Sequence, residues 1–484
     1  MPTVSVKGLP QILSPAYNNN VWYFDSTNKG LAGYRYVIKV YSYTTTLLAT
    51  YRFAPRPGDG YAVVDVTKLL KNFLSFDKTI VQGVDQIPNS WFGYYITVQD
   101  EYNTLYTYDD FSWYNGLTDL NSNVTLDTHN FNPGDQVLVS QDDGGALKPM
   151  LQGLFTVIDP TVAGTTDLYI NIPFNVVGSG VAVGGTVIYA DNRKTLSSVE
   201  YTTPTSYIFN GGLPFVDYPS YDYTNYEMYL TSTTKKFLTS IPRTGFKIYP
   251  TQDILLNFAN NFHSTKKILL ENNLGDKFSI EYGTITTTEP IMRANVSPSS
   301  TMTTVTGTAP LVKTGVTYYD VWAVVTETQV SEKIRFLIDD RCRISTDEIL
   351  FLDRMGSFVS FAFELRNKVT NSNTKSSYRK LAGDLGTGGD GNPGYTYTLD
   401  DRGETVYNVD LSQTIELNTN WMDDASSVYF QELVSSPATY IKQNGVYQAV
   451  VVTDASMEEK RAIDKKLIRY KITVSISNNS NVNI

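Results

Sequence analysis

The chain offers few side chains of the kinds that carry catalysis. It has two histidines, His129 and His263, and neither lies in an HExxH metal motif or beside a G-x-S-x-G nucleophile elbow. General base catalysis needs a base within hydrogen-bond reach of the group that it activates, and the sequence marks no such partner. We therefore expect both histidines to be structural or surface groups.

The single cysteine, Cys342, lies between Arg341 and Arg343, whose charges can lower the pKa of a thiol. It also ends an alternating strand pattern, where a lone cysteine is usually a small buried hydrophobe. We favour burial, with a reactive thiol as the alternative. One cysteine excludes an intrachain disulfide framework and a multi-cysteine metal site, and the N-terminus shows no charged-then-apolar leader. We expect synthesis and folding in a reducing cytoplasm.

Acidic doublets are the remaining catalytic candidates, because two carboxylates about 5 to 10 Å apart across a cleft can hydrolyse a glycosidic bond. Turn and helix-cap formation explains the doublets as well, and none has the spacing of a calcium loop. We predict no catalytic residue, no cofactor and no metal site, and keep a polysaccharide hydrolase as a third possibility. The doublets are Asp109 and Asp110, Asp142 and Asp143, Asp339 and Asp340, Asp400 and Asp401, and Asp423 and Asp424.

A polar, glycine-rich stretch over residues 366–404 carries a local cluster of cations. Its segment GDLGTGGDGNPG lacks the Lys and Ser/Thr of a phosphate-binding loop, so we predict a flexible loop or arm. The cations could be a solvated surface or could contact an acidic partner subunit or DNA. We take them, together with the loop at residues 77–90, as candidates for interface arms. The cations are Arg366, Lys368, Lys375, Arg379 and Lys380.

Composition limits the function further. The 484 residues carry a net charge of -10, so no general basic field exists to hold a phosphate backbone, and specific nucleic-acid binding is not expected. Charged residues are only 18% of the chain, while Tyr occurs 35 times. This composition favours pleated sheet and polar, adhesive surfaces.

The patterns predict an all-β chain. Residues 1–119 alternate in the manner of an antiparallel β-sandwich, with one short helix that Thr67 could cap. Short strands broken by Gly, Pro and Asp over residues 120–205 predict a small inserted β-barrel. A second β-sandwich follows over residues 206–345, and residues 346–484 predict a C-terminal α+β module with the flexible loop at 366–404.

The C-terminal module has the clearest local signals. Residues 348–365, EILFLDRMGSFVSFAFEL, contain too many charges for a membrane span and predict a hairpin that turns at Gly356 and fills the C-terminal core. Asp424 could cap a helix that runs to Val434. Asn444 and Gly445 form the preferred two-residue hairpin turn, and RYKITVSIS supplies another strand. We expect these elements to share one sheet, with the helix packed against it.

Four stretches carry a resemblance when they are taken together: SPAYNNNVWYFDS, FNGGLP followed by KKFLTSIPR, EILFLDRMGSFVSFAFEL, and the ending from WMDDASSVYFQEL to RYKITVSIS. They resemble tail and virion structural proteins of phages that infect Bacteroidota, including crAss-like phages. The resemblance covers most of the chain except residues 120–205 and brings no catalytic signature. It implies a virion component, in the tail, that forms a homo-oligomeric ring and contacts neighbouring tail or portal proteins.

An alternative function of a different class is a receptor- or glycan-binding protein at the tail periphery. Surface Tyr and Trp can stack on sugars, and Asn and Asp can hydrogen-bond to them. Loops that a rigid scaffold displays commonly carry recognition, so the inserted barrel is the expected site.

Overall fold

The structure is a computed structural model of the whole chain. It describes residues 3–31, 33–115, 123–125, 136–140, 153–159, 167–170, 178–197, 199–227, 233–260, 266–281, 289–325, 327–339, 347–365, 367–387, 391–396, 398–461, 466–478 and 480–483.

The described chain is almost entirely β-structure, as the sequence predicted, and it divides into two compact units. Unit 1 consists of Met1–Pro10, Asn20–Val66 and Gly93–Ser206, and unit 2 of Gln11–Asn19, Thr67–Phe92 and Tyr207–Ile484. Among the described residues, no helix is long and apolar enough to cross a membrane. The four ranges that we predicted from the sequence stay a prediction.

Unit 1 is built on antiparallel strand pairs. One sheet has the order β1 (Val4–Gly8), β3 (Val21–Ser26), β6 (Ala62–Asp65). In another sheet, β4 (Arg35–Ser42) lies between β5 (Leu47–Phe53) and β8 (Trp91–Asn115). Strand β8 also pairs with β14 (Tyr201–Thr202). Trp22 and Tyr94 are fully buried, and the indole N–H of Trp22 donates to the Tyr94 hydroxyl at 3.1 Å. The alternation seen in the sequence therefore places aromatic side chains in a core.

The inserted segment is described in part. Its strands are β9 (Asn123–Thr125), β10 (Gln136–Ser140), β11 (Gly153–Asp159), β12 (Asp167–Ile170) and β13 (Gly178–Leu196). Pairing runs in the order β8, β9, β12, β11, β10, β13, and β13 also pairs with β8. Much of the chain between these strands lies outside the described residues, so the small barrel stays a prediction.

Unit 2 holds most of the remaining strands. One sheet has the order β16 (Phe246–Ile248), β24 (Ile334–Ile338), β22 (Tyr318–Val325), β18 (Lys266–Asn272), β19 (Lys277–Glu281), β21 (Thr303–Thr306), with β23 (Thr328–Gln329) on β22. A second has the order β17 (Leu255–Ala259), β20 (Ile291–Asn295), β7 (Val84–Gln86). Two short strands, β2 (Leu13–Pro15) and β15 (Ser206–Phe209), pair in parallel.

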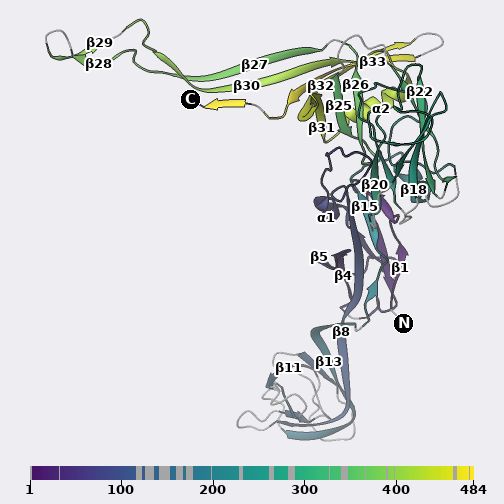
Figure 1. The fold of residues 1–484 in the computed structure, drawn as a ribbon. Coiled ribbons are helices and arrows are strands. Elements are labelled where there is room, and N and C mark those ends of the chain that lie inside the picture. The colour runs from purple at the N-terminus through teal and green to yellow at the C-terminus, as the bar shows by residue number, and fades with distance from the viewer. Residues whose placement is uncertain are drawn as a thin grey trace. The chain divides into compact units, whose positions relative to one another are not determined.

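The C-terminal sheet of unit 2 confirms the predicted arrangement. Its order is β26 (Phe358–Phe363), β25 (Asp347–Leu352), β31 (Thr439–Gln443), β32 (Val446–Arg461), β33 (Lys466–Ile476), β30 (Glu404–Asn418), β27 (Lys368–Arg379), with β34 (Ser480–Asn483) on β30. Helix α2 (Asp424–Ser435) packs against β25 and β33. Figure 1 shows this sheet with α2 beside it.

One hydrophobic core joins the sheets of unit 2. It contains Ile268 and Phe336 from the seven-stranded sheet, Phe258 from β17, and Phe351 and Tyr429 from the C-terminal sheet and α2. All five side chains are buried, so the C-terminal sheet and the sheets that precede it in the chain exclude water together. The core therefore includes residues from both sides of positions 345 and 346.

The hairpin predicted at residues 348–365 is confirmed. Strands β25 and β26 pair antiparallel from Asp347 and Phe363 to Leu352 and Phe358. Gly356 has a φ of 76°, and a Cβ there would lie 2.9 Å from the Asn210 carbonyl oxygen, so the turn needs glycine. The aromatic side chains of the stretch fill the core, as expected.

The capping prediction was wrong by one residue. Asp423, not Asp424, is the N-cap of α2, because its backbone is extended and its side chain accepts the N–H of Ser426 at 2.9 Å. Thr67 is the first residue of the short helix α1 (Thr67–Leu70), and its hydroxyl donates to the Asn18 carbonyl at 3.0 Å; its predicted role as a cap stays a prediction. The 3₁₀ turns are η1 (Lys71–Phe73), η2 (Tyr218–Ser220) and η3 (Tyr223–Asn225).

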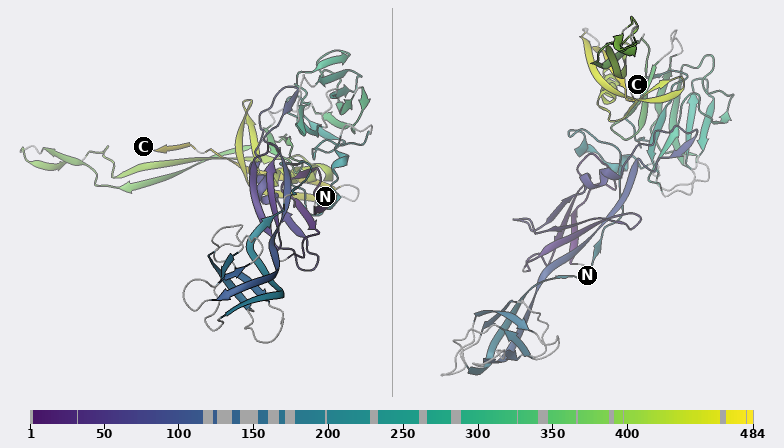
Figure 2. Two further views of the ribbon diagram at one scale, coloured as in Figure 1. Left: turned by 90° about the horizontal axis from the view of Figure 1, so that it is seen from below. Right: turned by 90° about the vertical axis from the view of Figure 1, so that its left-hand side faces the viewer.

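The stretch at residues 366–404 is largely strand where we predicted a loop. The twelve residues of β27 pair along their whole length with β30, and a second hairpin of β28 (Asp384–Thr387) and β29 (Pro393–Thr396) follows. Figures 1 and 2 show β27 and β30 as a long ribbon that leaves the C-terminal sheet, with β28 and β29 at its end. We call residues 368–418 the arm and residues 380–403 its tip.

The N-cap of α2 gives a direct test of the corrected assignment. We expect Asp423→Ala to lower the free energy of unfolding by about 1 kcal/mol, because the N–H of Ser426 loses its acceptor. Urea titration followed by circular dichroism measures the change. Asp454→Ala, at an exposed aspartate on β32, is the control and should change stability little; equal losses in both variants would contradict the capping role.

Candidate functional site

Strand β30 connects the arm to the core of unit 2, and the burial of its side chains changes along its length. Near its end, β30 carries Ile415 and Leu417, which are 1% and 0% exposed and belong to the core of unit 2. Its last residues pair with β33, from Thr414 and Ser475 to Asn418 and Lys471. The earlier half of β30 pairs with β27 and, over Asn408–Leu411, with β34, and it buries no side chain completely. The arm is therefore anchored in the core at its root and is paired along part of its length with β34.

The predicted cations do not form one patch on the arm. Lys368 lies opposite Glu416 and Arg379 opposite Glu404, while Lys375 lies opposite Val409 on the other face from Lys368. Lys380 follows the end of β27, and Arg366 lies outside the described residues. The return strand and tip add the acidic residues Asp384, Asp400, Asp401, Glu404, Asp410 and Glu416. Such mixed charge does not make a polyphosphate-binding surface.

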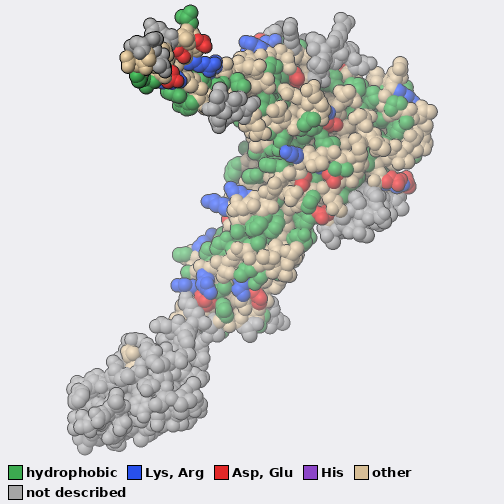
Figure 3. All heavy atoms as spheres, turned by 60° about the vertical axis from the view of Figure 1, so that its left-hand side comes forward, with side chains coloured by type: hydrophobic (Ala, Val, Ile, Leu, Met, Phe, Trp, Pro, Cys, Tyr) green, Lys and Arg blue, Asp and Glu red, His purple; other side chains and the backbone are tan. Residues whose placement is uncertain are grey.

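Exposed apolar side chains are the more informative feature of the arm. Leu385 on β28 and Tyr395 on β29 lie directly opposite each other, so they share one face of the tip hairpin. Leu385 is 76% exposed and Leu399 is fully exposed. Figure 3 shows hydrophobic side chains among charged ones at the arm. The exposed set along the arm is Val369, Tyr378, Leu381, Leu385, Tyr395, Leu399, Tyr407 and Leu411.

The arm has no core of its own. Every residue of β27 is exposed except Ser376, which is half-buried, so the side chains of this strand gain little burial from folding. A two-stranded ribbon is marginally stable in water without a surface to pack on. Its exposed apolar residues are therefore suited to contact with another molecule.

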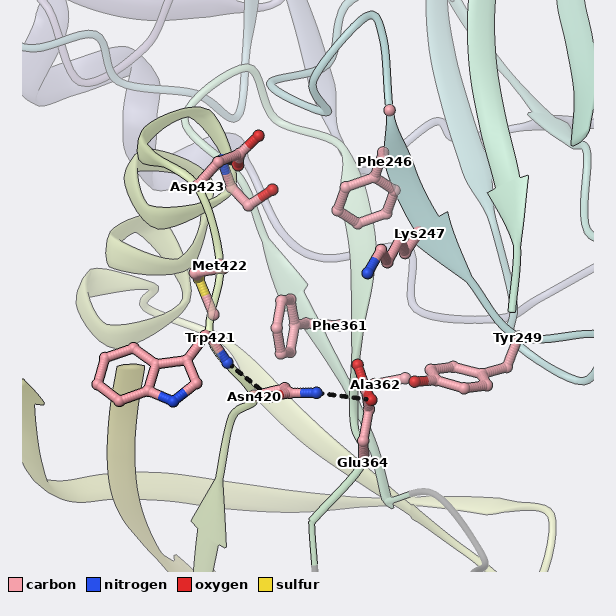
Figure 4. Close-up of a pocket in the computed structure, with 12 residues that line it drawn as sticks. Phe246, Lys247, Tyr249, Phe361, Ala362, Glu364, Asn420, Trp421, Met422 and Asp423 are labelled. Carbon is pink, nitrogen blue, oxygen red and sulfur yellow. Dashed lines mark hydrogen bonds between the residues drawn. The ribbon is translucent and has the colours of Figure 1, made fainter. Parts of the chain in front are cut away.

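A pocket lies at the root of the arm. Its volume is about 230 Å³, and it is lined by Phe246 and Lys247 of β16, Phe361 of β26, and Trp421 and Met422 before α2. Figure 4 shows Phe246, Phe361 and Met422 around one space, with the ammonium of Lys247 pointing into it. This aromatic pocket was not predicted from the sequence, because its residues come from three distant stretches.

Hydrogen bonds at the pocket join the two ends of the arm. The Asn420 amide, just after β30, donates to Glu364, just before β27, at 3.3 Å. The Asn420 side-chain oxygen accepts the N–H of Trp421 at 2.8 Å. Asp423, also at the pocket, is occupied as the N-cap of α2. These contacts leave Lys247 as the exposed cation among the pocket residues.

A pair of carboxylates at the C-terminal sheet, the buried Glu348 of β25 and the half-buried Asp253, has the composition of an acid–base site. Lys442 lies 2.5 Å from Asp253 and 3.2 Å from Glu348, and the Tyr447 hydroxyl donates to the same carboxylates at 2.7 and 2.9 Å. Burial raises the pKa of Glu348, against the charge of Lys442. Glu348 is buried, and both carboxylates bind Lys442 and Tyr447, so the group joins β25, β31 and β32.

A second buried acid, Asp353, holds the turn between β25 and β26. Its Oδ1 accepts the N–H groups of Met355 and Ser357 at 2.9 and 2.7 Å, and its Oδ2 accepts the N–H of Ser240 at 2.8 Å. Burial and, next, the charge of Glu432 raise the pKa of Asp353 to about 7, although these hydrogen bonds oppose the shift. Burial also raises the pKa of Glu432.

Some of the acidic doublets that were catalytic candidates form local hydrogen bonds in the structure. Asp423 caps α2, and Asp400 and Asp401 both accept hydrogen bonds from Thr398, so turn and cap formation explains these doublets. His129, His263, Cys342, Asp142, Asp143 and Asp340 lie outside the described residues. Within the described ranges, no group of three His, Cys, Asp or Glu residues could hold a metal ion.

The other predicted interface segment, residues 77–90, is fixed to unit 2. Its strand β7 pairs with β20, and the buried side chain of Arg293 lies 2.7 Å from Asp85 and donates to the Asp77 carbonyl. The Asp77 carboxylate accepts the N–H of Asn89 at 2.9 Å. The sequence of the segment lacks the apolar spacing of a core strand. In the structure the segment is nevertheless bound to β20 and does not project as an arm.

Comparison with known proteins leaves the chain without a family assignment. No family model matches it, and no curated protein matches it. Two solved structures show a likeness at 10% sequence identity: a phage phi92 endosialidase, with a TM-score of 0.17 over 98% of this chain and 70% of that one, and an E. coli alpha-2-macroglobulin, with a TM-score of 0.14 over 100% and 34%. TM-scores this low carry no argument about fold or function.

The raised pKa of Asp353 predicts a pH dependence of stability. The folded state holds the Asp353 proton up to about pH 7, whereas the unfolded state releases it near pH 4. The contribution is therefore fully present below pH 4 and is lost as the pH rises to 7. We expect the free energy of unfolding to be about 2 kcal/mol higher at pH 5 than at pH 8, measured by urea titration.

The charge on Glu432 allows a check of the cause. Glu432→Gln removes the neighbouring negative charge, which lowers the pKa of Asp353 and should reduce the difference between pH 5 and pH 8. Glu404→Gln, at an exposed carboxylate on the arm, is the matched control and should leave the difference unchanged. An unchanged pH dependence in Glu432→Gln would contradict the assigned repulsion.

Proposed function

We propose that this chain is a structural component of a phage virion, a tail ring or hub protein that assembles with itself and with neighbouring tail or portal proteins. The observation that carries the proposal is the arm: a twelve-residue exposed ribbon with an apolar tip and no core of its own. Interfaces commonly place aromatic and aliphatic anchors in pockets of a partner. The resemblance of the chain to tail and virion proteins supports the virion as the place of assembly.

The free edge of β27 favours contact through faces and side chains over edge pairing. Lys368, Lys375 and Arg379 lie along this edge strand, and charged side chains on an edge discourage the addition of another strand. Two β27 strands pairing antiparallel would bring cations together. The partner surface is therefore expected to receive the apolar residues of the arm. Such a contact would serve assembly, and we propose that the chain is not an enzyme.

The alternative of ligand recognition has one supporting observation within unit 2. A groove of about 570 Å³ is lined by Tyr221 and Tyr226, with Lys236, Arg243 and Arg354 around them. Arg354 pairs with Asp217 and Glu432 at 3.0 Å, and Arg243 with Glu332 at 2.8 Å. Tyrosine rings can stack on a sugar, and the charged side chains beside them can hydrogen-bond to its hydroxyl groups. Among the described residues this groove is the candidate for a glycan site, and the predicted site in the inserted segment stays a prediction.

Glycan recognition is tested with the full chain on a printed array of neutral and acidic oligosaccharides. If the groove binds sugar, Lys236→Ala should weaken the signal several-fold, because it removes an exposed donor without touching the core. Lys313→Ala, at a lysine elsewhere in unit 2, is the control. Absence of any signal, or equal loss in both variants, would remove this alternative.

The assembly proposal is tested by removing the arm. We expect replacement of residues 374–410 by Asn-Gly to lower the particle mass towards that of a monomer, measured by light scattering over a range of concentrations. The new turn joins Asn373 to Leu411, which lie directly opposite, so Ile415 and Leu417 stay in the core.

A matched control shortens another hairpin of the same sheet. Replacement of residues 460–467 by Asn-Gly joins Glu459 to Ile468, which also lie directly opposite. This variant should keep the particle mass of the unaltered chain. A chain that stays monomeric at every concentration before any deletion, or one whose mass is the same without the arm, would contradict self-assembly through the arm.

A further inference from the structure

We propose that the side chains of Lys442 and Asp253 condense to a covalent amide, with Glu348 transferring the protons, so that a cross-link joins β31 to the segment before β17. The bond forms once, within the folded chain, and the chain acts on itself and not on a substrate. This inference goes beyond the proposed function and does not depend on it, because it concerns the internal structure of unit 2.

The C-terminal sheet places three of the participating side chains in one row. Glu348 on β25 lies directly opposite Lys442 on β31, and Lys442 lies directly opposite Tyr447 on β32. Residues that lie directly opposite share one face of a sheet, so the three polar groups project to the same side. Asp253 lies against this row, with its Oδ2 2.5 Å from Lys442 Nζ and 2.7 Å from the Tyr447 hydroxyl.

The backbone of Asp253 is fixed in this position by hydrogen bonds. Its N–H donates to Glu348 Oε1 at 3.0 Å, and its carbonyl accepts the hydroxyl of Ser360 at 2.5 Å. The neighbouring Gln252 is buried and donates to Ser360 Oγ at 3.0 Å. The fold therefore holds the amine and the carboxyl group in contact, and such positioning can give an effective concentration of about 10⁵ M or more.

Burial favours a neutral acid beside the lysine. Glu348 is 5% exposed, and its burial raises its pKa although the charge of Lys442 opposes the shift. Burial lowers the pKa of Lys442, but the charge of Glu348 and the hydrogen bond to Asp253 raise it by more. The free amine is therefore a minor form, which suffices for a reaction that each chain carries out only once.

The condensation balances without an external reagent. The Lys442 nitrogen attacks the carboxyl carbon of Asp253, the Nζ–Cγ bond forms, one Cγ–O bond breaks, and one water leaves. The nitrogen loses two protons in succession to Glu348, whose Oε2 lies 3.2 Å from Nζ, and Glu348 passes both to the departing oxygen. The Tyr447 hydroxyl contacts both carboxylates and connects them for this transfer. The amide nitrogen keeps one hydrogen, and Glu348 ends as it began.

The cross-link closes a long loop of the chain. Asp253 and Lys442 lie 189 positions apart, and a bond between them limits the conformations of the unfolded chain, as a disulfide does. Ile254 and Ile441, which neighbour the two residues in the chain, are both buried in the core of unit 2. The bond therefore fastens two distant parts of the sequence that already pack in one core.

The test is the intact mass of the full chain, measured by mass spectrometry after the folded protein has been kept at neutral pH and then denatured. We expect a mass that is lower by one water than the sequence requires. Trypsin should then release a branched peptide in which residues 248–266 are joined through Asp253 to Lys442 of residues 403–460. An unchanged mass, or a loss of water without this branched peptide, as an aspartyl succinimide gives, would overturn the proposal.

Three variants separate the chemistry from the fold, which thermal melting checks in each. Glu348→Gln keeps the shape of the side chain but cannot carry the protons, and Lys442→Arg keeps a cation that does not attack a carboxyl group. Both should retain the full mass, and loss of one water with the same branched peptide in a folded Glu348→Gln chain would contradict the role of Glu348.

The matched control is Lys471→Arg, because Lys471 also lies 2.9 Å from a carboxylate, that of Glu416, on the same sheet, but is exposed. This variant should lose one water like the unaltered chain, and a full mass here would mean that the loss does not depend on the assigned pair. The mass of the unaltered chain decides the proposal even where a variant does not fold.

Discussion

The burial of one end of β30 is the constraint on which the exposed part of unit 2 depends. Ile415 and Leu417 lie in the core, while residues of the same strand closer to its start lie beside β27 in water. The ladder to β33 fixes the direction in which the ribbon leaves the sheet. The core of unit 2 thus supplies the stability that the ribbon lacks, and loss of packing at these two side chains would free both arm strands.

The same core also shapes the pocket at the root. Phe246 and Phe361 have one side towards the pocket and another against Tyr429 and Phe430 of α2. The Asp253, Glu348, Lys442 and Tyr447 cluster lies under the neighbouring strands and satisfies the buried charges by mutual contact. These side chains are of the types that carry out acid–base catalysis, but here they bind one another and hold strands together. The exposed groups of the arm are apolar and charged side chains.

The sequence predicted elements whose signals are local. Asn444 and Gly445 have the positive φ angles of a two-residue hairpin turn, and Gly356 has the backbone angle that its turn requires. The helix cap was misplaced because Asp423 and Asp424 have the same side chain, and only the backbone conformation decides between them. The fold class followed from strand alternation, which is also a local property.

The arm and the pocket could not be predicted in the same way. Strand β27, KVTNSNTKSSYR, has no apolar alternation, and its strand conformation comes from pairing with residues 404–416. The aromatic pocket joins stretches near residues 246, 361 and 421, so no spacing in the sequence marks it. From the sequence, the exposed leucines of the tip belong to a predicted polar loop. Their position at the end of the arm follows only from the pairing of β27 with β30.

The way in which β30 enters the sheet has a mechanical consequence. A pull on the tip along the ribbon reaches the body of unit 2 through the chain at both ends of the arm and through the pairs between β30 and β33, from Thr414 and Ser475 to Asn418 and Lys471. Hydrogen bonds of an antiparallel ladder run across the strands, so this load is in shear and all the pairs share it. A load applied across the ribbon would instead peel the pairs one at a time. The junction is therefore strong along the arm and weak to bending.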